Sequence, residues 1–125
     1  MRDEVKILSV CDQVRETAFA LHSYLRNGYL EKIYENGMFN RLRKLGLQVE
    51  RQRPLEVFDE DSTLLGEYAV DLFVEESLII ELKACKALAD EHIAQVLGYL
   101  RASRIRDALL INFGGAKLEV KKLIL

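Results

Sequence analysis

Two acidic residues and a lysine interrupt a strongly apolar stretch near the middle of the chain. They are Asp71, Glu81 and Lys83, in the pattern D-x9-E-x-K. The acids stand beside the apolar triplets LFV and LII, where a charge without a partner is expensive to bury. Carboxylate oxygens suit Mg²⁺ and Mn²⁺ as ligands, and a nearby lysine supplies a compensating charge. The three residues therefore predict a divalent-metal site.

A β-hairpin is the element that would bring the two acids together. Alternation of side chains predicts two strands within residues 67–85, joined by a short acidic turn. In the first strand one face carries Tyr68, Val70, Leu72 and Val74, and the other carries Ala69, Asp71 and Phe73. In the second strand one face carries Ile79, Glu81 and Lys83, and the other carries Leu78, Ile80 and Leu82.

The register of this hairpin predicts that the acids face each other. A turn centred on Glu76 pairs Val74 with Leu78. It therefore also pairs Asp71 with Glu81, and two carboxylates about 4 Å apart repel by roughly 4 kcal/mol at an effective dielectric near 20. A divalent cation between them turns this cost into a binding site. The alternative is a chance match, because D-x(n)-E-x-K with loose spacing occurs in many chains.

Two helices precede the hairpin. The 3.6-residue periodicity predicts an amphipathic helix over residues 4–26 and a second helix over residues 29–45. Glu31 falls in the core-facing sector of the second helix. It could merely favour the helix dipole from the first turn. A solvent-facing acid such as Glu35 would serve that purpose equally, so we predict a functional role for Glu31.

Three further strands are expected outside the central hairpin. Residues 48–58 predict a strand in which Pro54 indicates an edge position or a bulge. The first strand of the central hairpin begins at Thr63. Residues 107–113 and 117–124 predict two strands that offer no obvious catalytic group.

A third helix is predicted over residues 90–103, with Asp90 as its N-cap. His92, Gln95 and Tyr99 lie at positions i, i+3 and i+7 and form a polar face beside its apolar stripe. For His92, an ordinary solvated position is an equally good interpretation.

The second helix also carries the residues of a known motif. Gly28, Glu31 and Tyr34 spell G-x-x-E-x-x-Y, and the chain resembles the GxxExxY family, which is placed in the PD-(D/E)xK nuclease superfamily. Further segments resemble that family in the same order: VERQRPLEVF (49–58), GEYAVDLFVEESLIIELKA (66–84), HIAQVLGYL (92–100) and LLINFG (109–114). The resemblance covers about residues 17–124. The chain departs from it at Asn27 and Val70, where the family and the superfamily, respectively, usually have proline.

The fold implied by this resemblance agrees with the predicted elements. Their order, ααβββαββ, is typical of an α/β (α+β) fold with a restriction-endonuclease-like core, in which helices flank a central mixed β-sheet. At 125 residues and 50% hydrophobic composition, the chain has enough apolar material for one core. We expect residues 1–125 to form a single PD-(D/E)xK nuclease-like domain.

The resemblance also implies roles for particular residues. Asp71 and Glu81 would bind Mg²⁺ or Mn²⁺, and Glu31 would add a third carboxylate or hold a water of the metal. Lys83 would position or help deprotonate an attacking water. The expected substrate-binding residues are Gln95, Tyr99, Tyr34 and His92, and the candidates for neutralising phosphate charge are Arg51, Arg53, Lys86, Arg101 and Arg104.

Composition narrows the possible functions and partners. A net charge of −2 gives no global attraction to nucleic acid, so such binding would rely on local basic residues. Cys11 and Cys85 match no metal-binding spacing and predict reduced thiols and a cytoplasmic location. No apolar run approaches the length of a membrane span.

Two functional hypotheses from different classes follow. The first is an enzyme, a metal-dependent nuclease that hydrolyses DNA or RNA, and the complete set of Asp71, Glu81, Lys83 and Glu31 favours it. The second is a non-catalytic interaction or nucleic-acid-binding module that retains the fold and works as a homodimer or with a protein partner. The slightly acidic balance favours the second, or a nuclease that needs a partner.

Overall fold

The computed structural model describes residues 3–125, which fold into three helices and a five-stranded sheet. In chain order the elements are α1 (Glu4–Leu25), α2 (Glu31–Lys44), β1 (Val49–Phe58), β2 (Leu64–Val74), β3 (Leu78–Lys83), α3 (Asp90–Ser103), β4 (Asp107–Asn112) and β5 (Glu119–Ile124). The predicted order ααβββαββ is confirmed, and every boundary lies within two residues of its expected position. Among the residues described, no helix has the length and apolar character needed to span a membrane.

The strands form one mixed sheet in the order β1-β2-β3-β4-β5. β3 and β4 are parallel neighbours, and the other neighbouring pairs are antiparallel. A parallel pair needs a crossover connection, and the segment containing α3 supplies it. β1 lies at an edge of the sheet, where Pro54 is tolerated because proline cannot donate to a ladder. The expected edge position of Pro54 is therefore confirmed.

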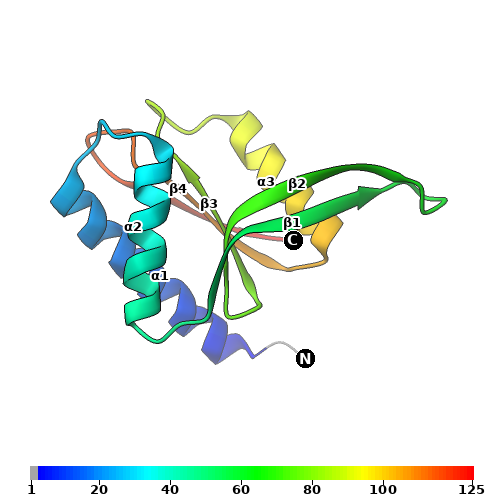
Figure 1. Ribbon diagram of the computed structural model, residues 1–125, viewed down its shortest axis with the longest axis horizontal. Coiled ribbons are helices and arrows are strands. Elements are labelled where there is room, and N and C mark those ends of the chain that lie inside the picture. The colour runs from blue at the N-terminus through cyan, green and yellow to red at the C-terminus, as the bar shows by residue number, and fades with distance from the viewer. Residues whose placement is uncertain (1–2) are drawn as a thin grey trace.

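Helices cover both faces of the sheet (Figure 1). α1 and α2 pack on one face, which includes Leu72, Ile80 and Leu82. α3 packs on the opposite face, which includes Phe73 and Ile79. β3 and β4 are buried on both sides, which explains why each reads as an almost continuous apolar run. The central mixed sheet flanked by helices is thus confirmed.

The β1–β2 hairpin bends where Gln52 and Asp71 face each other. The register continues across this point, but Gln52 and Asp71 do not form a ladder pair, and Gln52 has a φ of 52°. Leu72 packs toward α1 and α2, whereas Val70 packs toward α3. The predicted alternation on one face over residues 68–74 is therefore wrong, because the strand turns over at the bend. Beyond it, the hairpin extends away from the rest of the sheet (Figure 1).

Helix α3 begins with a different cap from the one expected. Its N-cap is Ala89, so the predicted Asp90 cap is wrong by one residue. Asp90 is the first helical residue and favours the helix dipole there. His92 reaches back to the cap, where its Nδ1 accepts the backbone N–H of Ala89 at 2.9 Å.

The end of β3, which carries Lys83, is tied to β4 by a buried asparagine. The Asn112 side chain donates to the Cys85 carbonyl and accepts from the Cys85 N–H, both at 3.0 Å. The Phe113 N–H donates to the Lys83 carbonyl at 2.8 Å. Gly114 passes so close to this segment that a β-carbon there would collide with the Cys85 backbone. These contacts fix the position from which the Lys83 side chain extends.

Candidate functional site

The candidate site lies where β2 and β3 separate. Their ladder consists of the pairs Val74–Leu78, Phe73–Ile79 and Leu72–Ile80. This confirms the predicted register, which brings Asp71 beside Glu81. Past the last pair, the Asp71 N–H donates to Glu81 Oε1 at 2.8 Å, and the Leu82 N–H donates to Asp71 Oδ2 at 2.8 Å. Each carboxylate is therefore held by a backbone N–H of the other strand.

The two acids carry an electrostatic cost when no cation lies beside them. Glu81 is only 4% exposed, and burial, reinforced by the charge of Asp71, raises the pKa of Glu81 to about 8. Burial also raises the pKa of Asp71, although the hydrogen bond from the Leu82 N–H opposes this shift. At neutral pH a carboxyl group with a pKa near 8 is mostly protonated. A cation bound here would have to displace that proton.

Lys83 lies among these acids. Its positive charge opposes the upward pKa shifts of Asp71, Glu81 and Glu31. Its Nζ lies 3.5 Å from Oε1 of Gln95, which extends from α3. The lysine therefore links the acids on the sheet to the polar face of α3.

α2 contributes a buried acid that was expected to face solvent. Glu35 is 4% exposed, so its predicted position is wrong. Its carboxylate accepts hydrogen bonds from Lys32 Nζ and Gln52 Nε2, both at 2.7 Å. Gln52 Nε2 also donates to Asp71 Oδ1 at 3.3 Å. Gln52, at the bend of the hairpin, thus joins Glu35 to Asp71.

Glu31 borders the site from the first turn of the same helix. It is exposed, so the expectation that it faces the core is wrong. Helical periodicity gives the direction of a side chain around the axis, but not how far the neighbouring elements extend along it. Glu31 nevertheless interacts electrostatically with the site. Partial burial, and then the negative charge of Asp71, raise the pKa of Glu31.

Tyr34 does not fit its predicted role in substrate binding. The side chain is fully buried and stacks on Phe113, with ring centroids 4.6 Å apart. Its hydroxyl donates to the Arg26 carbonyl at 2.5 Å and accepts the Tyr29 N–H at 3.3 Å. Tyr34 therefore anchors the turn between α1 and α2, from which Glu31 begins.

The three polar residues of α3 have different surroundings. Tyr99 is buried against Tyr68, with ring centroids 5.2 Å apart, and burial together with the charge of Glu81 raises the pKa of Tyr99 to about 12. Gln95 is exposed beside Lys83. His92 uses Nδ1 as an acceptor in the helix cap. The face of α3 that was predicted from spacing thus adjoins the acids.

Two of the arginines proposed to neutralise phosphate charge already have partners. Arg51 donates to Asn36 at 3.0 Å and lies 3.8 Å from the centroid of the Phe39 ring. Arg53 pairs with Glu50 at 3.0 Å. These arginines would have to leave existing contacts to reach a phosphate.

Sequence reasoning missed Glu35 and Gln52 as parts of the site. Glu35 lies four residues after Glu31, and an i, i+4 pair of acids on one helix face was a signal that could have been used. For Gln52 the sequence holds no such signal, because its position depends on the bend in the hairpin.

The donor chemistry of the site fits a hard divalent cation. Within residues 3–125, no three His, Cys, Asp or Glu side chains form a metal-ligand cluster. Mg²⁺ needs no such cluster, because it is usually held by one or two carboxylates and keeps several waters. Asp71 and Glu81 supply oxygen donors side by side. A cation between them would offset the burial that raises the pKa of both acids and the charge of Asp71 that further raises the pKa of Glu81.

Comparison with known proteins gives a match over most of the chain. Residues 9–123 match a family model described as the PD-(D/E)XK nuclease superfamily. The crystal structure of SSO0001 is similar, with a TM-score of 0.61 and 14% identity, over 74% of this chain and 48% of that one. The chain therefore spans about half the length of that protein, and at this identity the likeness concerns the fold alone. The expected restriction-endonuclease-like fold is confirmed. No curated protein matches the sequence significantly.

Proposed function

The chain belongs to the PD-(D/E)XK nuclease superfamily, and on that premise we propose that it is a metal-dependent nuclease acting on phosphodiester bonds of DNA or RNA. One observation carries the proposal: two opposed carboxylates, Asp71 and Glu81, are held by backbone N–H groups at the point where β2 and β3 separate. Carboxylates that lie opposite each other repel, and a hairpin built only for stability would not retain that repulsion. Lys83 beside them completes the D-x9-E-x-K pattern.

Each residue of the site has a role in this proposal. Asp71 and Glu81 would hold Mg²⁺ or Mn²⁺, with Glu31 as a third carboxylate or as an acceptor for a water of the ion. A bound divalent cation makes water a stronger acid and offsets the charge that develops on the phosphate. Lys83 would orient the attacking water and offset phosphate charge. Gln95, Tyr99 and His92, on α3, would lie on the substrate side.

Within the superfamily, we propose that the chain is a GxxExxY protein. The structure supports this proposal, because each residue of the motif has a physical reason to stand at its position. Gly28 has a φ of 118°, a conformation that residues with a β-carbon rarely adopt. Tyr34 anchors the same turn through its hydroxyl, and Glu31 borders the acids of the site.

Calorimetric titration of Mn²⁺ into metal-free protein tests the proposed site. We expect saturable binding that Asp71→Ala removes, because that variant leaves only the Glu81 carboxylate at the point where β2 and β3 separate. Glu56→Ala, which removes an exposed acid from β1, serves as the control and should bind as the parent does. A panel of single- and double-stranded DNA and RNA, with Mg²⁺ and Mn²⁺, then tests for cleavage. Protein that binds Mn²⁺ but cleaves nothing would favour the non-catalytic module, and protein that binds no Mn²⁺ would contradict the metal site.

Glu31 can be tested separately with the same titration. Glu31→Gln keeps the size of the side chain and removes its charge, so we expect Mn²⁺ affinity to fall roughly tenfold, as for other residues that support a metal indirectly. If Glu31 serves only the helix dipole, the substitution costs about 0.3–1 kcal/mol of stability. Unchanged Mn²⁺ affinity in a folded variant would exclude Glu31 from the metal site.

A further inference from the structure

A groove lies between the projecting hairpin and α3, directly beside the candidate site. Its volume is about 520 Å³. Its lining includes Phe58, Tyr68, Gln95, Gly98, Tyr99 and Arg101. Gln95 and Tyr99 belong both to this groove and to the candidate site, and Gln95 is the residue that contacts Lys83. The groove therefore continues from the point where the phosphate would react.

The floor of the groove contains a glycine that internal packing does not require. Gly98 lies in the middle of α3, where glycine is less stable than alanine. Among the residues that the structure describes, a β-carbon at this position would meet only the Arg101 guanidinium, at an ordinary 3.8 Å. No neighbour in residues 3–125 therefore demands the glycine, but its missing side chain keeps the groove open.

The wall opposite Gly98 presents exposed aromatic rings. Phe58 is 54% exposed and Tyr68 is 51% exposed, although both are large and apolar. Tyr68 packs against Tyr99 with ring centroids 5.2 Å apart, which orients the ring and leaves half of the residue in solvent. Arg101 brings a positive charge to the same groove. Aromatic rings with an adjacent cation are what proteins use to bind unpaired bases and their phosphates.

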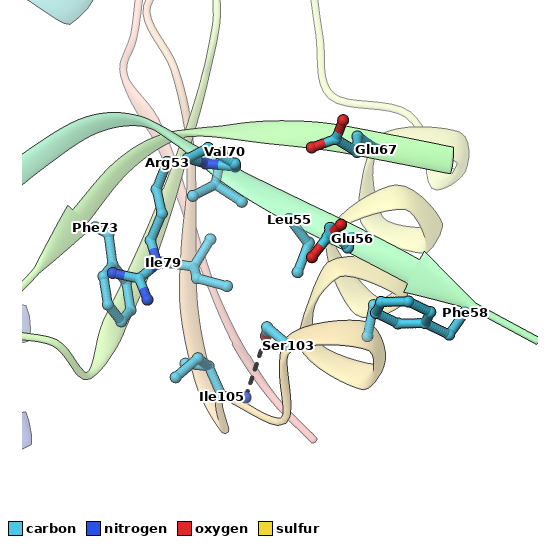
Figure 2. Close-up of a pocket in the computed structure, with 12 residues that line it drawn as sticks. Arg53, Leu55, Glu56, Phe58, Glu67, Val70, Phe73, Ile79, Ser103 and Ile105 are labelled. Atoms are coloured by element: carbon cyan, nitrogen blue, oxygen red, sulfur yellow. Dashed lines mark hydrogen bonds between the residues drawn. The ribbon is translucent and has the colours of Figure 1, made fainter. Parts of the chain in front are cut away.

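A second cavity under the same hairpin also has aromatic side chains, Phe58 and Phe73, but its charges differ from those of the groove (Figure 2). It also measures about 520 Å³, but Glu56 and Glu67 stand at its side and would repel a phosphate. Its one arginine, Arg53, is paired with Glu50 and lies 4.6 Å from the centroid of the Phe73 ring. Neither Lys83 nor Gln95 lines it. The groove beside Gly98 is therefore the one suited to a nucleotide.

We propose that the groove binds one unpaired nucleobase next to the phosphodiester at Lys83. The base would lie on the bare helix surface at Gly98 and stack against Tyr68 or Phe58. A base inside a duplex would first have to leave its stack, which disfavours duplex substrates. The preferred substrate class is therefore nucleic acid with unpaired nucleotides, such as a single strand or a frayed end. This inference rests on the proposed nuclease function, whose substrate it narrows.

Short oligonucleotides that contain the fluorescent base 2-aminopurine test the inference without relying on cleavage. In buffer with Ca²⁺, we expect the single-stranded probe to bind and its fluorescence to be quenched by stacking, and the duplex form to bind more weakly. Tyr68→Leu removes the ring, and Gly98→Leu fills the floor with a better helix former. Both should weaken single-strand binding by roughly 5- to 100-fold, the range expected for loss of one base stack.

Tyr24→Leu is the matched control, because Tyr24 is an exposed tyrosine on α1, outside the groove, and this variant should bind as the parent does. Thermal melts show that each variant is folded. If the probes bind but neither groove variant changes affinity or quenching, the base pocket is overturned while the nuclease proposal stands. If no oligonucleotide binds, in single- or double-stranded form, both fail.

Discussion

Lys83→Met is expected to reduce phosphodiester cleavage by about 10²- to 10⁴-fold, the usual effect of removing a group that transfers protons or stabilises charge at the reacting centre. The reason is its place among the acids: it lies on the strand of Glu81 and its charge acts on Asp71, Glu81 and Glu31. Methionine keeps much of the apolar stem and removes the charge. Mn²⁺ binding should persist or strengthen, since a cation at the acids no longer meets a second positive charge.

Cleavage rates and Mn²⁺ calorimetry on the same preparations separate these effects. Lys121→Met is the matched control and should cleave normally. Lys121 is exposed on β5, the strand at the opposite edge of the sheet from β1. A Lys83 variant that cleaves at the parental rate would remove this residue from the mechanism. Loss of both cleavage and Mn²⁺ binding would instead mean that Lys83 holds the site together.

The parts of the fold that follow from local pattern were predictable. β3 and β4 are apolar on both faces, and their runs of Leu and Ile identify them as buried strands. The short turn after Val74 fixed the hairpin register, which the structure confirms. The bend at Asp71 was not predictable. It depends on the conformation of Gln52 and on the separation of β2 from β3, and neither changes the alternation of apolar and polar residues in the sequence.

The candidate site was likewise predictable from the sequence only in part. The spacing of Asp71, Glu81 and Lys83 indicated that they belong together, because two paired strands place them at adjacent positions. Glu35 was misplaced for a different reason. A helical wheel has no information about where the sheet ends, so it assigned burial to Glu31 rather than to the acid one turn later.

The cost of holding the acids together should be measurable in metal-free protein. Glu81 is the better residue to neutralise, because glutamine there can still accept the Asp71 N–H through its amide oxygen. Asp71 accepts from both Leu82 and Gln52, through different oxygens, so asparagine would lose one of these bonds. The informative variant is therefore Glu81→Gln. Glu67→Gln, at an exposed position of β2, is the matched control.

In EDTA, the parent protein should lose stability as pH rises from about 4.5 to about 8. The pKa of Glu81 is raised from 4.5 to about 8 in the folded state, so the folded protein binds the proton more tightly than the unfolded chain does. The stability that this proton contributes is complete below the unfolded pKa and is lost as pH rises through the folded pKa. By linkage it amounts to at most about 5 kcal/mol. Thermal melts across this range should show a steep decline for the parent and for Glu67→Gln.

Glu81→Gln should show a flatter decline, because it cannot lose that proton, and in EDTA at pH 8 it should be more stable than the parent. Excess Mn²⁺ should stabilise the parent at pH 8, by about 2.7 kcal/mol at 100 times the dissociation constant, and should stabilise the variant much less. Two outcomes would contradict this account. A variant with the parental pH dependence would mean that Glu81 is not the group that titrates. A variant that is strongly destabilised in EDTA at pH 8 would mean that the Glu81 carboxylate has a structural partner, and that its charge supports the fold rather than awaiting a cation.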